Sequence, residues 1–162
     1  PIVGYNFGAR QFPRVLRALK YTILCGMGVT TLGFIISHVF PDGVAKLFID
    51  LDKDPENSLQ LFTVVKEGLR IATLAYPLVG FQIVSSNFFQ YIGKPQKAIV
   101  LSMTRQLLFL VPLIMIFPGR FGTMGVWMSM PIADTLATIL TGILLFFQVR
   151  QLKYRPDSVK VI

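Results

Sequence analysis

The feature that most constrains this chain is a long apolar run near its end, from Val126 to Val149. It can cross a bilayer as one helix, which takes about 20 mainly apolar residues. Pro131 and Asp134 interrupt the run in its first half. A carboxylate at the centre of a membrane helix costs about 2.5–3.5 kcal/mol, so it normally faces a protein interior or a watery cavity. The run therefore predicts a membrane helix, and it makes Asp134 a candidate functional residue.

The composition also indicates a membrane protein. Only 15% of the residues are charged and 53% are hydrophobic, whereas a soluble domain carries about 25% charged residues. The formal net charge is +8. However, the basic residues lie in short gaps between apolar runs and not along one polar face, which argues against nucleic acid as a partner. Cys25 is the single cysteine, which excludes a disulfide within the chain and a thiolate metal cluster.

Three further apolar runs, at residues 21–40, 69–92 and 98–117, predict membrane helices. Together with residues 126–149 they predict an all-α polytopic membrane protein with four crossings. Prolines lie within three of the four runs, where membrane helices tolerate a kink. These helix-kink candidates are Pro77, Pro112 and Pro131.

Small side chains recur every three or four residues along the first predicted helix. This spacing places them on one face, where they allow another helix to approach closely. They are Thr22, Gly26, Thr30, Gly33 and Ser37. The pattern predicts a helix-packing face.

Polar side chains form stripes on the second and fourth predicted helices. Four-residue steps place polar groups on one face, which in a membrane protein indicates a bundle interior or a cavity. Hydrogen bonding between helices and the lining of a substrate cavity are both compatible with these stripes. The candidates for a substrate cavity are Gln82, Ser86, Asn87, Gln90, Asp134, Thr138 and Thr141.

Arg105 lies two turns inside the third predicted helix, about 10 Å from its start. A long arginine can extend from that depth to the membrane interface. Alternatively, it can meet a polar or charged partner inside the bundle. The sequence therefore makes Arg105 a candidate intramembrane charge partner.

The basic residues also predict the orientation. One side collects four basic residues before the first helix, two between the second and third, and four after the last, which makes ten. The opposite side collects four, at Lys46, Lys53, Lys66 and Arg120. Because Lys and Arg accumulate in cytoplasmic loops, both ends of the chain are expected to be cytoplasmic.

The expected organisation has three parts. Residues 1–20 are the end of an upstream helix followed by a basic cytoplasmic segment, residues 21–149 are the four-helix transmembrane part, and residues 150–162 are a cytoplasmic tail. The chain starts at Pro1 with neither an initiator methionine nor a signal segment. We therefore expect a piece of a longer polypeptide.

Four short motifs, in order along the chain, resemble the C-terminal part of a multidrug and toxic compound extrusion (MATE) transporter. They are PIVGYNFGA at residues 1–9 followed by basic residues, FQYIGK at 89–94, RQ at 105–106 with Pro112, and GVW at 125–127 leading to PIAD at 131–134. The resemblance covers most of the chain. The exceptions are the outer loop at residues 42–66 and the tail.

The resemblance implies a twelve-helix transporter with two six-helix lobes, of which this chain supplies the last four helices of the second lobe. It also implies that amphipathic, often cationic drugs or toxic compounds are exported across the cytoplasmic (inner) membrane. The coupling ion would be H⁺ or Na⁺, with no bound cofactor. The partners would be the lipid bilayer, the remaining helices of the same polypeptide and small organic cations.

In one respect the sequence departs from the family. Some members carry an acid that helps bind the coupling cation in the helix matching residues 69–92, but this chain has Gln82 and Asn87 there and no carboxylate. Alternatives to an exporter are a lipid-linked oligosaccharide flippase of a related fold and a non-transporting membrane scaffold. An enzyme is not expected, because no arrangement of His, Cys, Ser and acid residues pairs a nucleophile with a base.

Overall fold

The computed structural model describes residues 1–47 and 55–154, with side chains in the second range from residue 59 onward. Within these ranges the regular structure is entirely helical, as the sequence predicts. The elements in chain order are α1 (Ile2–Gly8), α2 (Phe12–Val39), α3 (Pro41–Lys46), α4 (Pro55–Ala72), α5 (Tyr76–Tyr91), α6 (Pro95–Met103), the π-helix η1 (Thr104–Leu110) and α7 (Val111–Lys153).

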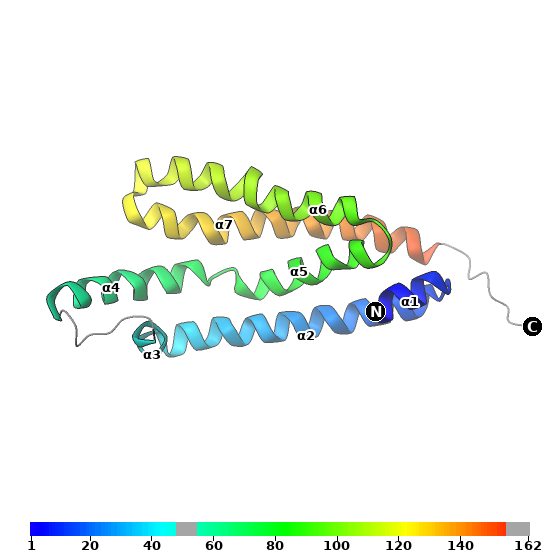
Figure 1. Cartoon of the computed structure of the whole chain (residues 1–162), viewed down its shortest axis with the longest axis horizontal. Coiled ribbons are helices and arrows are strands. Elements are labelled where there is room, and N and C mark those ends of the chain that lie inside the picture. The colour runs from blue at the N-terminus through cyan, green and yellow to red at the C-terminus, as the bar shows by residue number, and fades with distance from the viewer. Residues whose placement is uncertain (48–54, 155–162) are drawn as a thin grey trace, which may run out of the picture.

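Gly122 divides α7 into two antiparallel legs. Its backbone angles, φ 57° and ψ −143°, are not helical, and a positive φ is easily adopted only by glycine. A Cβ on Gly125 would collide with the backbone of Phe117 and Pro118, so the two legs touch backbone to backbone near the reversal. The first leg continues the line of α6 and η1, and the second leg runs back beside it (Figure 1).

The long segments lie roughly antiparallel to their chain neighbours in one elongated bundle (Figure 1). One end of the bundle holds α1, the turn between α5 and α6, and the end of α7. The opposite end holds α3, the start of α4 and the reversal at Gly122. The chain therefore passes along the bundle repeatedly, which is the arrangement that a polytopic membrane protein requires.

Two stretches of the described chain have the length and apolar character to cross a membrane: α2 and the range 95–153, which contains the reversal. A third candidate is the pair formed by residues 59–72 and 76–91, which are bent by 54° relative to each other. In α2 and the range 95–153, only 6% of the most apolar window is buried inside the protein. Such apolar, uncovered helices suit a lipid environment.

Several predicted helix boundaries differ from the structure. The first long helix begins at Phe12 instead of residue 21, and its first turn contains Pro13. A proline is favoured in a first turn because its missing N–H would have no intrahelical acceptor there. Of the four basic residues before residue 21, Arg14, Arg17 and Lys20 therefore belong to this helix, and Arg10 lies in the turn before it. The last helix similarly extends to Lys153. Residues 48–54 of the outer acidic loop, and the tail from residue 155, lie outside the described residues.

The prediction of one helix over residues 69–92 was wrong. The structure has two helices there, α4 and α5, with a break at residues 73–75. Pro77 lies in the first turn of α5, so the bend precedes it. A proline inside a continuous helix would remove one hydrogen bond and clash with the carbonyl four residues earlier, here that of Thr73. Breaking the helix at this point avoids that clash.

Helices α2 and α5 approach each other closely at two glycines. A Cβ built on Gly80 would lie 2.5 Å from the carbonyl oxygen of Gly26 and from Oγ1 of Thr30. The two backbones therefore touch, as the small residues of α2 predict. Cys25, on the same helix, is exposed and not packed, because it points away from this contact face.

The apolar core lies toward the end of the bundle that holds α1. Its most buried members include Val15, Phe88, Phe89, Leu101 and Leu152. At the same end, Nζ of Lys94, in the turn before α6, donates a hydrogen bond of 2.6 Å to Oε1 of the buried Gln148. The packed end joins α2, α5, α6 and the second leg of α7, and so fixes how these helices face one another.

Candidate functional site: an intramembrane ion pair beside a polar cavity

An ion pair joins η1 to the second leg of α7. Nε of Arg105 donates a hydrogen bond of 2.6 Å to Oδ1 of Asp134. The Asp134 side chain is 6% exposed and that of Arg105 is 38% exposed. A buried carboxylate needs such a partner, because an unpaired charge in a low-dielectric interior is strongly unfavourable. The arginine is therefore held inside the bundle and does not extend to the interface.

The pair lies near the middle of the expected membrane. Arg105 is ten residues from Pro95, which begins α6, and a rise of 1.5 Å per residue places it about 15 Å along the helix. Asp134 is twelve residues from Gly122, about 18 Å from the opposite end. The hydrocarbon core is about 30 Å thick. The two distances therefore place the pair at about half depth.

The π-helix η1 sets the position of Arg105. It spans Thr104–Leu110, and Pro112 follows in the first turn of α7. Pro112 cannot donate to the carbonyl of Leu108, and in an α-helix its ring would clash with that carbonyl. A wider π turn relieves this conflict and rotates the side chains before it. Such π turns are rare and frequently occur at functional sites.

A polar cavity of about 130 Å³ adjoins Arg105. Its lining comes from α5, α6 and η1 and consists of Gln82, Ile83, Ser86, Asn87, Ser102 and Arg105. Gln82 is 4% exposed, and its Oε1 has no hydrogen-bond partner within the described parts of the chain. A buried amide without a partner is unusual and calls for a water or a ligand. The cavity is therefore a candidate binding site.

The structure brings four of the sequence candidates into this lining: Gln82, Ser86, Asn87 and Arg105. A fifth candidate, Asp134, contacts Arg105. Ser102 is a lining residue that sequence reasoning missed. It precedes Arg105 by three residues, a spacing that places two side chains on one helix face. That spacing was the available signal.

Gln90 lies apart from this lining and is exposed. Steps of four residues drift by about 40° each around a helix, so Gln90 is about 80° around α5 from Gln82. Thr138 and Thr141 follow Asp134 on α7, and their hydroxyls are buried without partners among the described residues. They do not line the 130 Å³ cavity.

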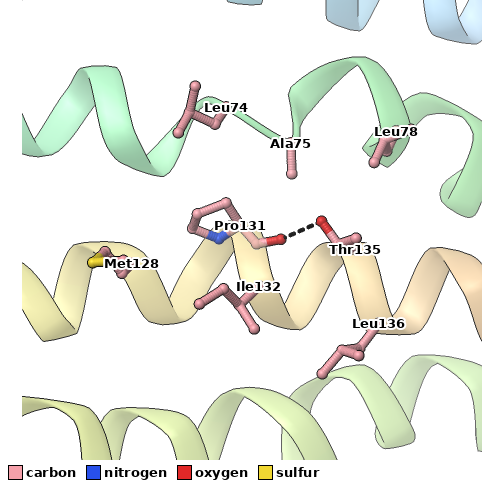
Figure 2. Close-up of a pocket in the computed structure, with 8 residues that line it drawn as sticks. All are labelled: Leu74, Ala75, Leu78, Met128, Pro131, Ile132, Thr135 and Leu136. Carbon is pink, nitrogen blue, oxygen red and sulfur yellow. Dashed lines mark hydrogen bonds between the residues drawn. The ribbon is translucent and has the colours of Figure 1, made fainter.

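A second, apolar pocket of about 410 Å³ lies where α4 and α5 break (Figure 2). Leu74, Ala75 and Leu78 line one side, and residues 128–136 of α7 contribute the other. Pro131 is inside α7 here, and its carbonyl accepts a hydrogen bond of 2.7 Å from Oγ1 of Thr135. This pocket offers apolar contact but few polar groups, so it has no evident chemistry.

Outside the expected spans, one carboxylate has a perturbed pKa. Lys66 Nζ lies 2.6 Å from Oδ1 of Asp42 and joins α4 to α3. The hydrogen bond from Lys66 lowers the pKa of Asp42 below its ordinary value of 3.8, and the positive charges of Lys66, Lys46 and Arg70 act in the same direction. No group of three or more His, Cys, Asp or Glu side chains in the described residues could hold a metal ion.

Comparisons with known proteins identify the family. The MatE family model matches residues 1–116, and no curated protein matches the chain. A structure described as the inward-facing conformation of a multidrug resistance MATE family transporter of the MOP superfamily has a TM-score of 0.83 and 24% identity, over 94% of this chain and 34% of its own. The structure described as the outward-facing conformation also has a TM-score of 0.83 and 24% identity, over 94% and 33%.

A further solved structure, described as protein A, is 34% identical with a TM-score of 0.80, over 96% of this chain and 33% of its own. The chain thus spans about a third of the length of these structures. The family match covers most of the chain. The similarity of the fold to these solved structures covers nearly all of it. The chain therefore belongs to the MatE family, a family of multi-pass membrane transporters and not of enzymes.

Proposed function

We propose that this chain is part of a cation-coupled antiporter that exports amphipathic, often cationic drugs or toxic compounds across the cytoplasmic membrane. The observation that carries the proposal is the Arg105–Asp134 pair at half membrane depth beside a polar cavity. Transporters place substrate and coupling-ion sites near the bilayer midplane. Ionisable groups at that depth are costly, which favours a functional role for them.

In the proposed architecture, the chain supplies four crossings of a six-helix lobe in a twelve-helix transporter. The crossings are α2, the bent α4–α5 pair, the stretch from α6 to the reversal at Gly122, and the second leg of α7. Eight basic residues of the described chain fall toward the end that holds α1, the turn between α5 and α6 and the end of α7, which supports cytoplasmic ends. The chain covers about a third of the length of its solved relatives. Four helices of a twelve-helix transporter would make up the same share.

Alternating access supplies the transport mechanism. The chain has the same TM-score to a structure described as inward-facing and to one described as outward-facing. This equality supports a lobe part that keeps its internal arrangement while it moves against the rest of the transporter, as rigid-body rocking requires. The backbone contact between Gly26 of α2 and Gly80 of α5 provides that rigidity.

Asp134 is the proposed participant in ion coupling. In its charged form it balances Arg105, and protonation or Na⁺ binding would weaken that balance and free the guanidinium. Polar side chains would line the path of the substrate and hydrogen-bond to the substrate or to water there. They are Gln82, Ser86, Asn87, Thr138 and Thr141. H⁺ and Na⁺ both remain candidates for the coupling ion.

Dye efflux from proteoliposomes that contain the complete transporter tests this proposal. A proton gradient or a sodium gradient is imposed separately, with the wild type, Asp134→Asn and the matched control Asp42→Asn. We expect one gradient to drive efflux, Asp134→Asn to abolish it, and Asp42→Asn to leave it unchanged, because Asp42 is exposed outside the spans. Efflux that survives Asp134→Asn would reduce Asp134 to a structural role. Absence of efflux by folded protein under both gradients would refute the exporter.

A further inference from the structure

The 130 Å³ cavity contains hydrogen-bond donors that have no acceptor. Arg105 uses Nε on Asp134, and its two terminal amino groups have no partner within the described chain. The guanidinium group has no acceptor of its own and presents its N–H groups in a fixed fork that fits a carboxylate. The terminal amino groups are therefore available to a ligand in the cavity.

The remaining lining is polar and carries no negative charge. Gln82, Ser86, Asn87 and Ser102 line the cavity together with Arg105, and the unpartnered atom of Gln82 is its acceptor Oε1. Among the lining residues Arg105 is the only ionisable one, and Asp134 is the acid that contacts it. A carboxylate in the cavity would thus meet donors and no facing carboxylate. A lone cation would meet the positive end of the pair and no acidic partner.

The size of the cavity limits the ligand to a small head group. Its volume of about 130 Å³ corresponds to about four water molecules at about 30 Å³ each. Drug-sized ligands occupy pockets of about 300–1,000 Å³. The cavity therefore fits a carboxylate with a few adjoining carbons, and the rest of a substrate molecule would extend beyond it.

We propose that this cavity binds the carboxylate of zwitterionic substrates, with the terminal amino groups of Arg105 as the principal donors. The inference rests on the proposed function and specifies its substrate class as compounds that carry a carboxylate as well as a cation. Asp134 holds the guanidinium group through Nε and directs the terminal groups toward the cavity. Nε2 of Gln82 and the hydroxyl of Ser102 donate further hydrogen bonds to the head group.

Two dyes that differ in one group provide the test. Rhodamine 110 carries a free carboxylate, and rhodamine 123 is its methyl ester. Binding of each dye to the purified complete transporter is measured by fluorescence anisotropy, which requires no ion gradient. The double variant Arg105→Gln/Asp134→Asn removes both charges together, so that no buried carboxylate is left unpaired. Gln82→Leu removes the amide but leaves the ion pair in place.

Matched controls lie on the same chain. Gln90→Leu makes the same substitution two turns further along α5, outside the lining, and Arg120→Gln removes an exposed arginine near the reversal. We expect the double variant to weaken rhodamine 110 binding at least about tenfold, since hydrogen bonds to charged groups are strong. We expect Gln82→Leu to weaken it about threefold, and rhodamine 123 binding and both controls to change by less than about twofold.

The possible outcomes separate this inference from the proposed function. Three results would overturn the carboxylate site. The double variant could lose the binding of both dyes equally, or it could bind rhodamine 110 as the wild type does. The wild-type transporter could also bind rhodamine 123 and not rhodamine 110. Selective loss of rhodamine 110 would support the carboxylate site. Selective loss without gradient-driven efflux would support the site and refute the exporter. Binding of neither dye by folded wild type, with no efflux, would refute both.

Discussion

Gly80→Ala tests the contact on which the helix arrangement depends. The new Cβ would lie 2.5 Å from the Gly26 carbonyl oxygen and from Oγ1 of Thr30, and 2.6 Å from the Gly26 carbonyl carbon. Ordinary contacts of this kind are 3.4–4 Å. Helices α2 and α5 would therefore have to separate by about 1 Å, because two of the three atoms belong to a backbone that no side-chain rotation can move.

The expected cost follows from this displacement. Overpacking costs about 1–3 kcal/mol, and a separation of 0.5–1 Å loses about a quarter to a half of each contact's dispersion energy. We expect a value near the upper end, about 3 kcal/mol, because the obstacle is backbone. The higher helix propensity of alanine returns about 1 kcal/mol. The net destabilisation should be about 2 kcal/mol.

Thermal unfolding of the detergent-solubilised transporter measures this effect. Gly28→Ala is the matched control, because it makes the same substitution on α2 with no atom within 4 Å of the new Cβ. Gly26→Ala should be intermediate, since its nearest obstacle is the movable side chain of Val84, 2.9 Å away. We expect Tm to fall in the order Gly28→Ala, Gly26→Ala, Gly80→Ala. Equal Tm values for Gly28→Ala and Gly80→Ala would refute the backbone contact.

The remaining predictions concern the two ion pairs. Arg105→Ala should destabilise the protein by about 3 kcal/mol, because it leaves the buried Asp134 carboxylate unpaired. Adding Asp134→Ala should restore part of that loss, and additive losses in thermal unfolding would contradict the pair. The second pair, Asp42 with Lys66, stabilises the fold only while Asp42 is ionised. Lys66 holds the pKa of Asp42 below 3.8. The stabilisation by this pair is therefore complete above pH 3.8 and is lost as the pH falls through the lowered pKa. Asp42→Asn should therefore show a shallower loss of Tm between about pH 5 and pH 2 than the wild type, and identical acid profiles would contradict this assignment.

Helix periodicity explains which parts of the site the sequence could predict. Four-residue spacing placed Gln82 and Ser86 on one face, and both line the cavity. The same spacing groups Gln90 with them, but Gln90 lies outside the lining of this cavity, because a drift of about 40° per step accumulates along the helix. The apolar run at residues 69–92 also reads as one helix with Pro77 inside it, whereas the structure contains a break before Pro77 and a 54° bend.

The sequence by itself determined the all-α membrane class, the antiparallel path and the unusual carboxylate at Asp134. These properties depend on hydrophobic length and charge placement, which are local features of the chain. Only the tertiary structure decided that Arg105 pairs with Asp134 and not with the membrane interface. That contact joins residues 29 positions apart, and it depends on the π turn of η1 and on the reversal at Gly122. Pairwise contacts across such distances are set by how the helices pack, and a pattern along one helix does not contain them.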